Sequence, residues 1–357
     1  MLDHKILQRN CRRMGTRLAK LGVRLRPHMK TAKSAEVAHL ACHDHFGGIT
    51  VSTLAEASFF FEAGFKDIAY AVSMVPGKTH QAARLARAGC RLALLTDDLT
   101  TIYKIAKQSE KLGVHFPVSI EINSGGDRGG LHPMDPQLAK IAATITRSSA
   151  LTFEGLLTHG GHAYNSTSIS DIRRAAEDER KSVVTAARRL ADRGIVCPVT
   201  SVGSTPTATY TQNTSGITEM RPGVYMFGDL AQVDLQCCVT SDIAVTVAST
   251  VIGHNKPAGQ LLIDAGALAL SQDLSPQSVQ NTYGRLVDDE NLQVIKVNQE
   301  HGTVAHLNDS TQFEKYPIGS VVRILPNHIC MTAAPYNRMY VIENNTIESM
   351  WNRATGW

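Results

Sequence analysis

Lys30 stands in the segment LRPHMKTAK, at the end of a short apolar run. A lysine amine attacks a carbonyl carbon when it is held neutral, and partial burial favours the neutral form. The alternative is an ordinary surface lysine whose charged end reaches into water. If the apolar run is a strand, Lys30 lies at its carboxyl end, where either role is open.

The segment GSTPT, at residues 203–207, follows another apolar run. Gly203 would let the backbone approach an anion, and Ser204 and Thr205 offer hydroxyl and amide groups at an expected helix start. A plain turn with a helix cap has the same composition. If this turn and Lys30 lie at the same end of one sheet or barrel, however, the two together indicate pyridoxal phosphate. That cofactor would bind to the lysine through its aldehyde and to the turn through its phosphate.

Aromatic and cationic side chains follow two further apolar runs. THGGHAY carries His159, His162 and Tyr164, and NSGGDRGG carries Asp127 and Arg128. Imidazole and phenol rings can stack on a flat cofactor or hydrogen-bond to its edge. Either histidine is a candidate for the ring contact.

His328 and Cys330 in PNHIC form a candidate metal site. In a strand, residues two apart face the same side, and imidazole and thiolate are ligands that suit zinc. A buried histidine beside a buried cysteine gives the same pattern without a metal. Two protein ligands would leave positions open for water or substrate, as in a catalytic metal site.

Eight short β-rich runs, which alternate with amphipathic helical stretches from residue 23 to about residue 230, would position most of these residues. This alternation predicts a (β/α)8 TIM barrel, in which sites lie at the carboxyl ends of the strands. After about residue 235 only short β-rich runs remain. We therefore predict a barrel domain at residues 1–235 and a β-domain at residues 236–357. The eight runs are VRLRPH, GITVS, DIAYAV, RLALLT, FPVSIEI, FEGLLTH, CPVTSV and EMRPGVYMF.

The bulk composition argues against several classes of protein. The 357 residues are 43% hydrophobic with a net charge of +4, and the positive charges are spread along the chain, so nucleic acid is not an expected partner. The basic start HKILQRNCRRMGTRLAK is typical of the polar side of a surface helix, with a phosphate-binding face as the alternative. No apolar run approaches the roughly 18 residues of a membrane span. Seven irregularly spaced cysteines favour a cytoplasmic protein with reduced thiols.

Taken together, the segments resemble the D-serine dehydratase and D-threonine aldolase family. RPHMKTAK resembles the RPHxKTHK segment of that family, and the resemblance covers essentially the whole chain. It implies the alanine racemase-like fold of fold-type III pyridoxal enzymes: a pyridoxal-phosphate-binding TIM barrel with a C-terminal β-domain, assembled as a homodimer. The other segments that carry it, in the same order, are EINSGGDRGG, THGGHAY, GSTPT, RPGVYMFGD, DAGALALSQD, QEHG, PNHIC and WNRATGW.

The resemblance also implies a role for individual residues. Lys30 would form the Schiff base with the cofactor and move the α-proton. The phosphate would be held at the 203–207 turn with help from Tyr225, and Tyr164 would sit near the pyridine nitrogen. The residues that it places at the cofactor are Lys30, Arg128, His159, His162, Tyr164, Gly203, Ser204, Thr205 and Tyr225. His328 and Cys330 would bind Zn²⁺, with Mn²⁺ and Mg²⁺ as alternatives.

The chain departs from the family pattern at two places. Ala32 stands where the family usually has another histidine, so any role of that side chain is absent. The start MLDHKILQRN lacks the short strand that usually joins the β-domain, so we expect either that the domain lacks one strand or that a neighbouring segment supplies it.

The His-x-Cys pair is typical of the dehydratase branch, whereas the aldolase branch tends to carry His-x-Asp. The resemblance thus implies a zinc-dependent dehydratase of D-serine, D-threonine or D-threo-3-hydroxyaspartate, giving a 2-oxo acid and ammonia. The alternatives are a D-threonine aldolase that yields glycine and an aldehyde, an amino acid racemase, a pyridoxal phosphate carrier, and a barrel for another phosphorylated ligand.

Overall fold

The computed structural model describes residues 1–43, 47–126, 128–274, 281–307 and 311–357, so Asp127 lies outside the described residues. The chain divides into two compact units. We call them the barrel unit, Arg12–Gly223 with Gly356–Trp357, and the β unit, Met1–Cys11 with Val224–Thr355. This division starts the β unit at Val224 and adds the first eleven residues to it, whereas the prediction separated the domains at residues 235 and 236.

Each of the eight predicted runs of the barrel unit contains a strand. All neighbouring strands pair in parallel, in the order β2-β9-β8-β7-β6-β5-β4-β3. A parallel bridge between His28 and Thr50 joins the two ends of this row and completes the ring. The strands are β2 Arg24–Leu25, β3 Ile49–Val51, β4 Asp67–Ser73, β5 Arg91–Thr96, β6 Phe116–Glu121, β7 Leu151–Leu157, β8 Val199–Val202 and β9 Glu219–Met220.

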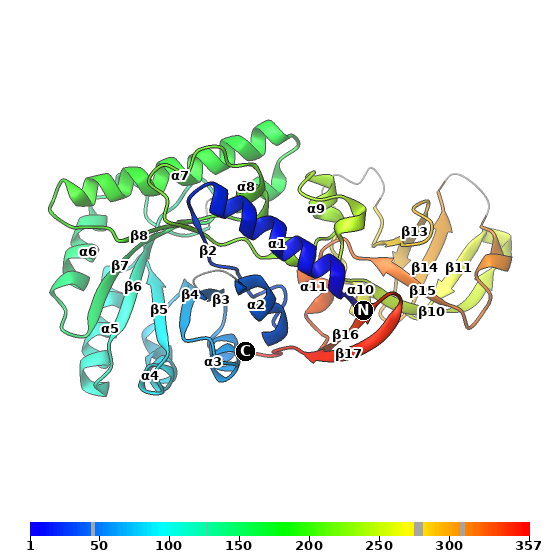
Figure 1. Cartoon of the computed structure of the whole chain (residues 1–357), viewed down its shortest axis with the longest axis horizontal. Coiled ribbons are helices and arrows are strands. Elements are labelled where there is room, and N and C mark those ends of the chain that lie inside the picture. The colour runs from blue at the N-terminus through cyan, green and yellow to red at the C-terminus, as the bar shows by residue number, and fades with distance from the viewer. Residues whose placement is uncertain (44–46, 127, 275–280, 308–310) are drawn as a thin grey trace. The chain divides into compact units, whose positions relative to one another are not determined.

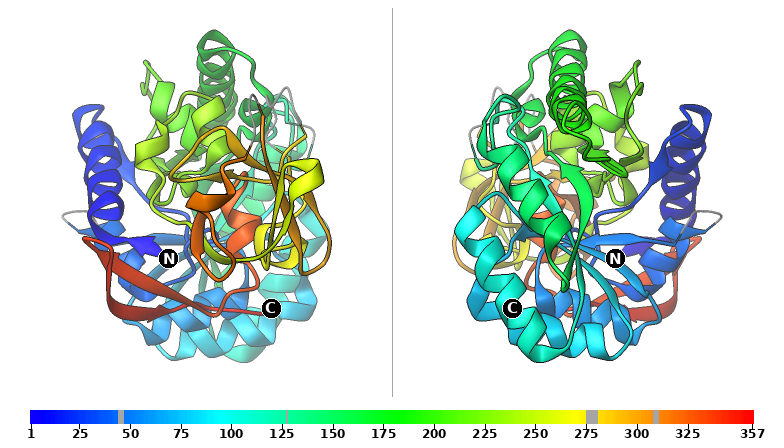
Figure 2. Two further views of the ribbon diagram at one scale, coloured as in Figure 1. Left: turned by 90° about the vertical axis from the view of Figure 1, so that its right-hand side faces the viewer. Right: turned by 90° about the vertical axis from the view of Figure 1, so that its left-hand side faces the viewer.

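Helices connect the strands and lie outside them (Figure 1 and Figure 2). Strands such as β5 and β6 are buried along nearly their whole length, as expected for parallel strands covered on both faces. The (β/α)8 prediction is therefore confirmed. The helices are α2 Ala35–Cys42, α3 Leu54–Glu62, α4 Thr79–Arg87, α5 Leu99–Leu112, α6 Gln137–Arg147, α7 Ile169–Ala191 and α8 Thr205–Tyr210.

Strand β9 is shorter than its predicted run and ends at Met220. Pro222 follows, and a proline has no N–H to donate to a neighbouring strand. Its carbonyl still accepts from the His28 amide at 2.9 Å, so the chain stays beside β2 without continuing the strand.

A buried charge network links Arg26, just after β2, to the first residues of β4 and β9. Arg26 Nε donates to Glu219 Oε2 at 3.0 Å, and the two terminal nitrogens of Arg26 donate to both carboxylate oxygens of Asp67. Ser201 donates to the other oxygen of Glu219 at 2.6 Å. Arg26 and Glu219 are both buried, so each charge depends on its partners.

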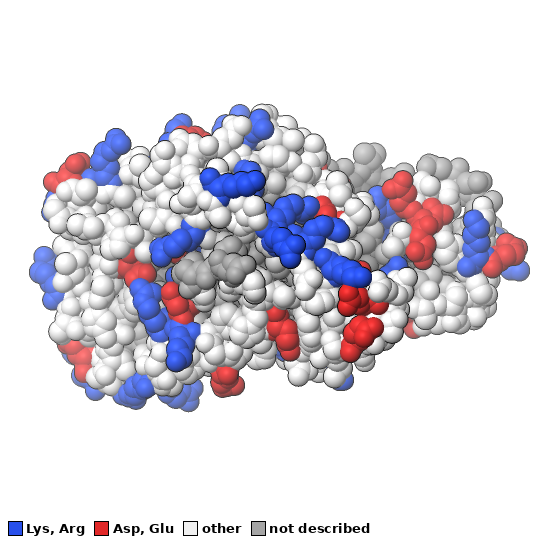
Figure 3. All heavy atoms as spheres, viewed as in Figure 1, with Lys and Arg blue, Asp and Glu red and all other residues white. Residues whose placement is uncertain are grey.

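Helix α1, His4–Lys20, is amphipathic as its sequence predicts. Leu7, Cys11, Met14 and Leu18 are buried at helical spacing, and basic residues cover the other side. Figure 3 shows these basic side chains gathered over α1, with basic and acidic side chains mixed elsewhere on that face. This supports the interpretation as the polar side of a surface helix.

From Val224 onward the β unit consists of β-strands and short helices, as predicted. Six strands close into a small barrel in the order β10-β11-β14-β13-β12-β15, with buried aliphatic side chains inside it. The strands are β10 Val247–Asn255, β11 Gln260–Ile263, β12 Arg285–Leu286, β13 Leu292–Val297, β14 Gly302–His306 and β15 Val321–Leu325. The short helices are α9 Leu230–Asp234, α10 Ala267–Leu270 and α11 Ile329–Ala333.

A second sheet of the β unit corrects the expectation of a missing strand. Its order is β1-β16-β17, and β1, Leu2–Asp3, pairs in parallel with β16, Arg338–Glu343. β16 pairs in turn with β17, Thr346–Asn352. Two residues suffice for β1 because Leu2 is fully buried there, and the Asp3 amide donates to the Ala244 carbonyl at 2.8 Å.

The described residues were searched for membrane-spanning helices and for disulfides. No helix among them combines the length and the apolar character that a membrane crossing requires. All seven cysteines are described, and none of them forms a disulfide.

Candidate active site at the barrel mouth and candidate metal site

A cavity of about 330 Å³ lies at the carboxyl ends of the barrel strands. It brings together Lys30, Arg128, His159 and Gly203 from four different loops, as the sequence predicted for a barrel site. Arg221 joins them from the segment after β9. An amine, two guanidinium groups and an imidazole therefore line one cavity, which suits an anionic, carbonyl-bearing molecule.

Lys30 follows β2, two residues beyond the bridge between His28 and Thr50. Its backbone amide donates to Nδ1 of His28 at 3.4 Å. Burial, reinforced by the charges of Lys30 and Arg221, holds the pKa of His28 well below its usual range. The Lys30 residue is exposed, because it lies past the end of the strand. Of the two environments that the sequence left open, this is that of a surface lysine.

His159 lines this cavity, and its ring lies 6.5 Å from the ring of Tyr164. Burial, followed by the positive charges of Lys30, Arg128 and Arg221, lowers the pKa of His159 to about 3. A hydrogen bond with the Gly203 backbone opposes this shift. The imidazole is therefore neutral near pH 7.

His162 and Tyr164 lie in the 3₁₀ helix Gly161–Asn165. Gly126 packs near His162, since a Cβ on that glycine would lie 3.7 Å from Nδ1 of the histidine. That nitrogen is buried and finds no hydrogen-bond partner among the described residues. Of the two histidines, only His159 lines the cavity of about 330 Å³.

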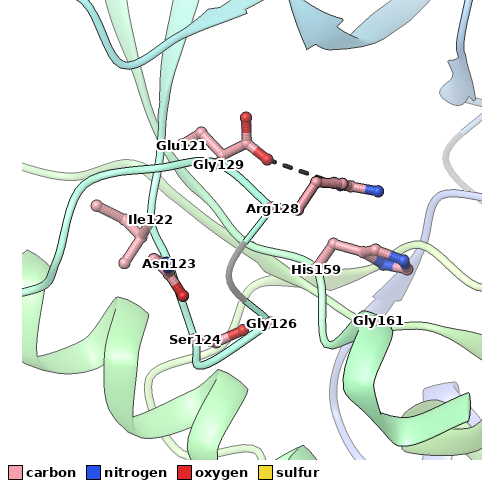
Figure 4. A pocket seen from close by; sticks show the side chains of 9 residues that line it. All are labelled: Glu121, Ile122, Asn123, Ser124, Gly126, Arg128, Gly129, His159 and Gly161. Atoms are coloured by element: carbon pink, nitrogen blue, oxygen red, sulfur yellow. Dashed lines mark ion pairs between the residues drawn. The ribbon is translucent and has the colours of Figure 1, made fainter. Parts of the chain in front are cut away.

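Glu121 and Arg128 form an ion pair beside a smaller cavity of about 90 Å³ (Figure 4). Their charged atoms Oε1 and Nη2 are 3.7 Å apart, and Ser73 donates to the other oxygen of Glu121. Burial raises the pKa of Glu121, and the Arg128 charge opposes that shift. The pair holds an otherwise exposed guanidinium beside the cavity, as Figure 4 shows.

Arg221 is a buried cation that the sequence prediction did not assign to the site. It donates to the Ser201 hydroxyl and to the Thr158 carbonyl. Burial lowers its pKa to about 10, against the charges of Glu219, Glu179 and Glu121, so it remains charged at neutral pH. It thus contributes a fixed positive charge to the cavity.

The 203–207 turn has the predicted form of a helix start. Ser204 is the N-cap of α8, and it exchanges hydrogen bonds with Thr207. Gly203 has φ +108°, a backbone conformation that only glycine adopts without strain. A Cβ at this position would also lie 3.1 Å from the backbone nitrogen of Arg221. The amides of Gly203 and Ser204 already donate to Glu179 and Thr207, so these bonds shape the turn from within the protein.

In the β unit, His328 and Cys330 lie in a helical turn, which corrects their predicted place on a strand. His328 is the N-cap of α11, and Cys330 is in its first turn. The two side chains nevertheless interact, because His328 precedes the helix with an extended backbone (φ −134°, ψ 96°), which does not impose helical spacing on the pair. A hydrogen bond with Cys330, opposed by burial and reinforced by Asp273, raises the pKa of His328 to about 9.

Three polar residues hold this turn in place. Asp273 Oδ2 lies 2.6 Å from Nδ1 of His328, and Asp229 accepts from the Ile329 amide at 3.0 Å. Asn327 donates to the carbonyls of Asp273 and Thr282. Burial raises the pKa of Asp229 to about 6. Within the described ranges, no three His, Cys, Asp or Glu residues form a metal-binding group, so the pair would leave positions open.

Tyr225, the last predicted cofactor residue, is buried in the 3₁₀ helix Val224–Met226 of the β unit. Its role at the phosphate stays a prediction. Glu121, Arg221, Asp229 and Asp273 all stand within segments that carried the resemblance. Their charge in otherwise apolar or glycine-rich runs was the available signal.

Two family descriptions match the chain. Residues 2–231 match "Alanine racemase, N-terminal domain", and residues 244–342 match "Putative serine dehydratase domain". The D-threo-3-hydroxyaspartate dehydratase of Delftia sp. (strain HT23) is 38% identical over 100% of this chain and 97% of its own length. The D-serine dehydratase of Dictyostelium discoideum is 32% identical over 95% and 91%.

Solved structures of D-threo-3-hydroxyaspartate dehydratase are also similar. The structure from Delftia sp. HT23 matches with a TM-score of 0.96 at 39% identity, covering 100% of this chain and 97% of that one. Another is a cysteine-to-alanine variant in a metal-free form, with a TM-score of 0.96, 38% identity and coverage of 100% and 97%. A 3-hydroxy-D-aspartate aldolase of Paracoccus denitrificans is 25% identical over 98% and 89%.

Proposed function

Because the chain belongs to the D-serine dehydratase and D-threonine aldolase family, with its alanine racemase-like fold, we propose that it dehydrates a D-3-hydroxy amino acid. The products are a 2-oxo acid and ammonia. Similarity to a dehydratase over the whole chain carries this choice of reaction. D-serine, D-threonine and D-threo-3-hydroxyaspartate are the candidate substrates.

Pyridoxal phosphate fits the barrel mouth. The cavity offers an exposed primary amine, two guanidinium groups and a glycine turn, which match an aldehyde, an anion and a close backbone approach. The buried Nδ1 of His162, which has no hydrogen-bond partner among the described residues, adds an unused polar group nearby. When bound, the cofactor supplies an electron sink for negative charge at the α-carbon of an amino acid.

Different residues of the cavity would have different roles toward that cofactor. Lys30 would hold the cofactor through Nζ when substrate is absent, and the amine that the substrate displaces would then be free to take the α-proton. His159 contacts the ring as a neutral group, since its pKa of about 3 leaves it unprotonated. Arg128 and Arg221 attract the anionic groups of cofactor and substrate.

The remaining assignments complete the cofactor site. Gly203, Ser204 and Thr205 would hold the phosphate at the start of α8, and the help expected from Tyr225 stays a prediction. Tyr164 would lie near the pyridine nitrogen, and its ring is 6.5 Å from that of His159. His162, which packs near Gly126, is the alternative to His159 for the contact with the cofactor ring and the substrate.

Zinc fits the His328–Cys330 pair. Asp273 engages Nδ1 of His328 and leaves Nε2 for a metal, which is the usual arrangement around metal-binding histidines. The thiol favours Zn²⁺ over Mg²⁺, with Mn²⁺ also weaker by ligand softness. When bound, the metal supplies a Lewis acid that makes a hydroxyl a better leaving group.

A homodimer is the proposed assembly. Tyr340 on β16 and Met350 on β17 are register partners, and both are exposed. Adjacent exposed apolar side chains on one sheet support a protein-binding face. The substrate is a small molecule, and the cytoplasmic location stays a prediction.

Product analysis tests the reaction. Purified protein is incubated with pyridoxal phosphate, zinc and D-threonine, and the products are separated. We expect 2-oxobutanoate and ammonia. Glycine with acetaldehyde would instead establish the aldolase alternative, which the 25% identical aldolase relative keeps open.

Substitution of Lys30 tests the cofactor site directly. K30A should lose the visible absorbance of bound pyridoxal phosphate. K33A is the matched control, because Lys33 pairs with Glu56 at 3.1 Å and is three residues away in the same segment. Equal absorbance in K30A and the unaltered protein would show that another amine holds the cofactor.

A further inference from the structure

Glu179 is a charged residue in the apolar interior of the barrel unit, and the proposed mechanism does not use it. It lies in the middle of α7 and is 0% exposed. A buried carboxylate is costly unless hydrogen bonds compensate it. Burial raises the pKa of Glu179, while the Thr207 hydroxyl and the amides of Gly160 and Gly203 oppose that shift.

One oxygen of Glu179 joins two loops of the barrel mouth. Oε1 accepts from the Gly160 amide in the loop after β7, and from the Gly203 amide in the turn after β8 at 3.1 Å. The loop after β7 packs directly on the carboxylate, because a Cβ on Gly160 would lie 2.7 Å from Cδ of Glu179. Both loops carry residues of the cofactor site.

The same bonds reach His159. Its ring hydrogen-bonds with the backbone of Gly203, and the amide of Gly203 is held by Glu179. Ser204 in turn donates to the Thr207 hydroxyl at 2.9 Å, and that hydroxyl interacts with Glu179. The orientation of His159 and the shape of the 203–207 turn therefore depend on one carboxylate.

Attachment of α7 to the barrel does not require Glu179. The helix buries an apolar row of Ile172, Ala175, Ala176, Val183, Ala186 and Leu190. A side chain that served only packing at this place would be apolar as well. The presence of a carboxylate at this position is explained by the hydrogen bonds that it accepts from the amides of Gly160 and Gly203.

We propose that Glu179 is a positioning residue, which holds the 158–164 loop and the 203–207 turn together so that the phosphate and the ring of the cofactor can bind at once. The proposal rests on the proposed function for its ligand. It predicts that loss of the carboxylate weakens binding of the phosphate-bearing cofactor more than binding of its phosphate-free form.

The test compares E179A, E179Q and E179D with the unaltered protein. Each is titrated with pyridoxal phosphate and with pyridoxal, which lacks the phosphate, and binding is followed by absorbance. We expect E179A to weaken pyridoxal phosphate binding about tenfold or more, because two buried amides lose their acceptor. E179Q should retain most of the affinity, since an amide oxygen can accept both bonds. E177A on the same helix is the control, because Glu177 pairs with Arg180 instead.

Several outcomes would overturn the proposal. Equal binding by E179A and the unaltered protein is one, and equal weakening for pyridoxal and pyridoxal phosphate with a lower Tm is another, since it would mark a purely structural role. If E179A fails to fold, E179D decides, because its shorter side chain should not reach both amides; unaltered binding would refute the proposal.

Amide hydrogen exchange separates this inference from the proposed function. In the cofactor-free protein, E179A should speed exchange across residues 158–164 and 203–207, whereas E177A should not. If the unaltered protein binds neither pyridoxal compound, the proposed function fails. The exchange result then still supports or overturns the joining of the two loops by Glu179.

Discussion

Replacement of Asp273 by alanine should weaken zinc binding at the His328–Cys330 pair about tenfold. Asp273 Oδ2 lies 2.6 Å from Nδ1 of His328, a short distance that is typical of a charge-assisted hydrogen bond. Such bonds are worth about 1.5–3 kcal/mol, and partners of metal-binding histidines contribute about 10–100-fold in affinity. The side chains of His328 and Asp273 are 41% and 42% exposed, so solvent screening places the effect at the lower end.

The assay is competition for zinc between the protein and a coloured chelator, without substrate. D288A is the matched control, because Asp288 is an exposed carboxylate of the same unit. H328A should lose measurable zinc binding altogether. If D273A and D288A both bind zinc like the unaltered protein, the carboxylate does not orient the ligand, and the proposed metal geometry is wrong.

Three further outcomes follow from the charges of the barrel unit. K30M should raise the pKa of His159, read from its ring signals in NMR, although burial will keep it below the ordinary value; an unchanged pKa would contradict the placement of Lys30. R26M should lower the free energy of unfolding by about 3–5 kcal/mol in urea titrations, because it strands the buried carboxylate of Glu219. Burial would raise the pKa values of Asp67 and Glu219, but Arg26 outweighs it and lowers both, so the stability they confer should be present above about pH 4 and lost as the pH falls through the lowered values. The deficit of R26M should therefore shrink in acid, and a constant deficit would refute the coupling.

The repeating elements were predictable because each leaves a local pattern. Eight buried parallel strands produce apolar runs, and the connecting helices bury periodic faces, so both signals survive in one sequence. β1 was missed because only two residues form it, and its partner β16 lies more than 300 residues away in the chain. The helical turn at His328 was missed because a five-residue helix has no period to recognise.

Several residues that line the cavity could be predicted from the sequence, but the residue that joins the loops around it could not. Lys30, Arg128, His159 and Gly203 stand in segments whose spacing after strands indicates a shared opening, and they do line one cavity. Glu179 could not be found this way. It lies within a long helix among other acidic residues, and only the folded chain shows that its carboxylate faces the amides of two distant loops.

The charged residues at the barrel mouth act on one another. Burial, followed by the charges of Lys30, Arg128 and Arg221, lowers the pKa of His159, so the ring stays neutral beside three cations. Glu121 and Glu179 reduce the repulsion among Lys30, Arg128 and Arg221, because each carboxylate offsets the buried charge of Arg221. An anionic occupant would offset the positive charge that lines the cavity, including the buried charge of Arg221, whereas a cationic one would add to it. In the proposed site, charge would favour an anionic ligand, and the 203–207 turn and Lys30 would then favour a phosphate with an aldehyde over other anions.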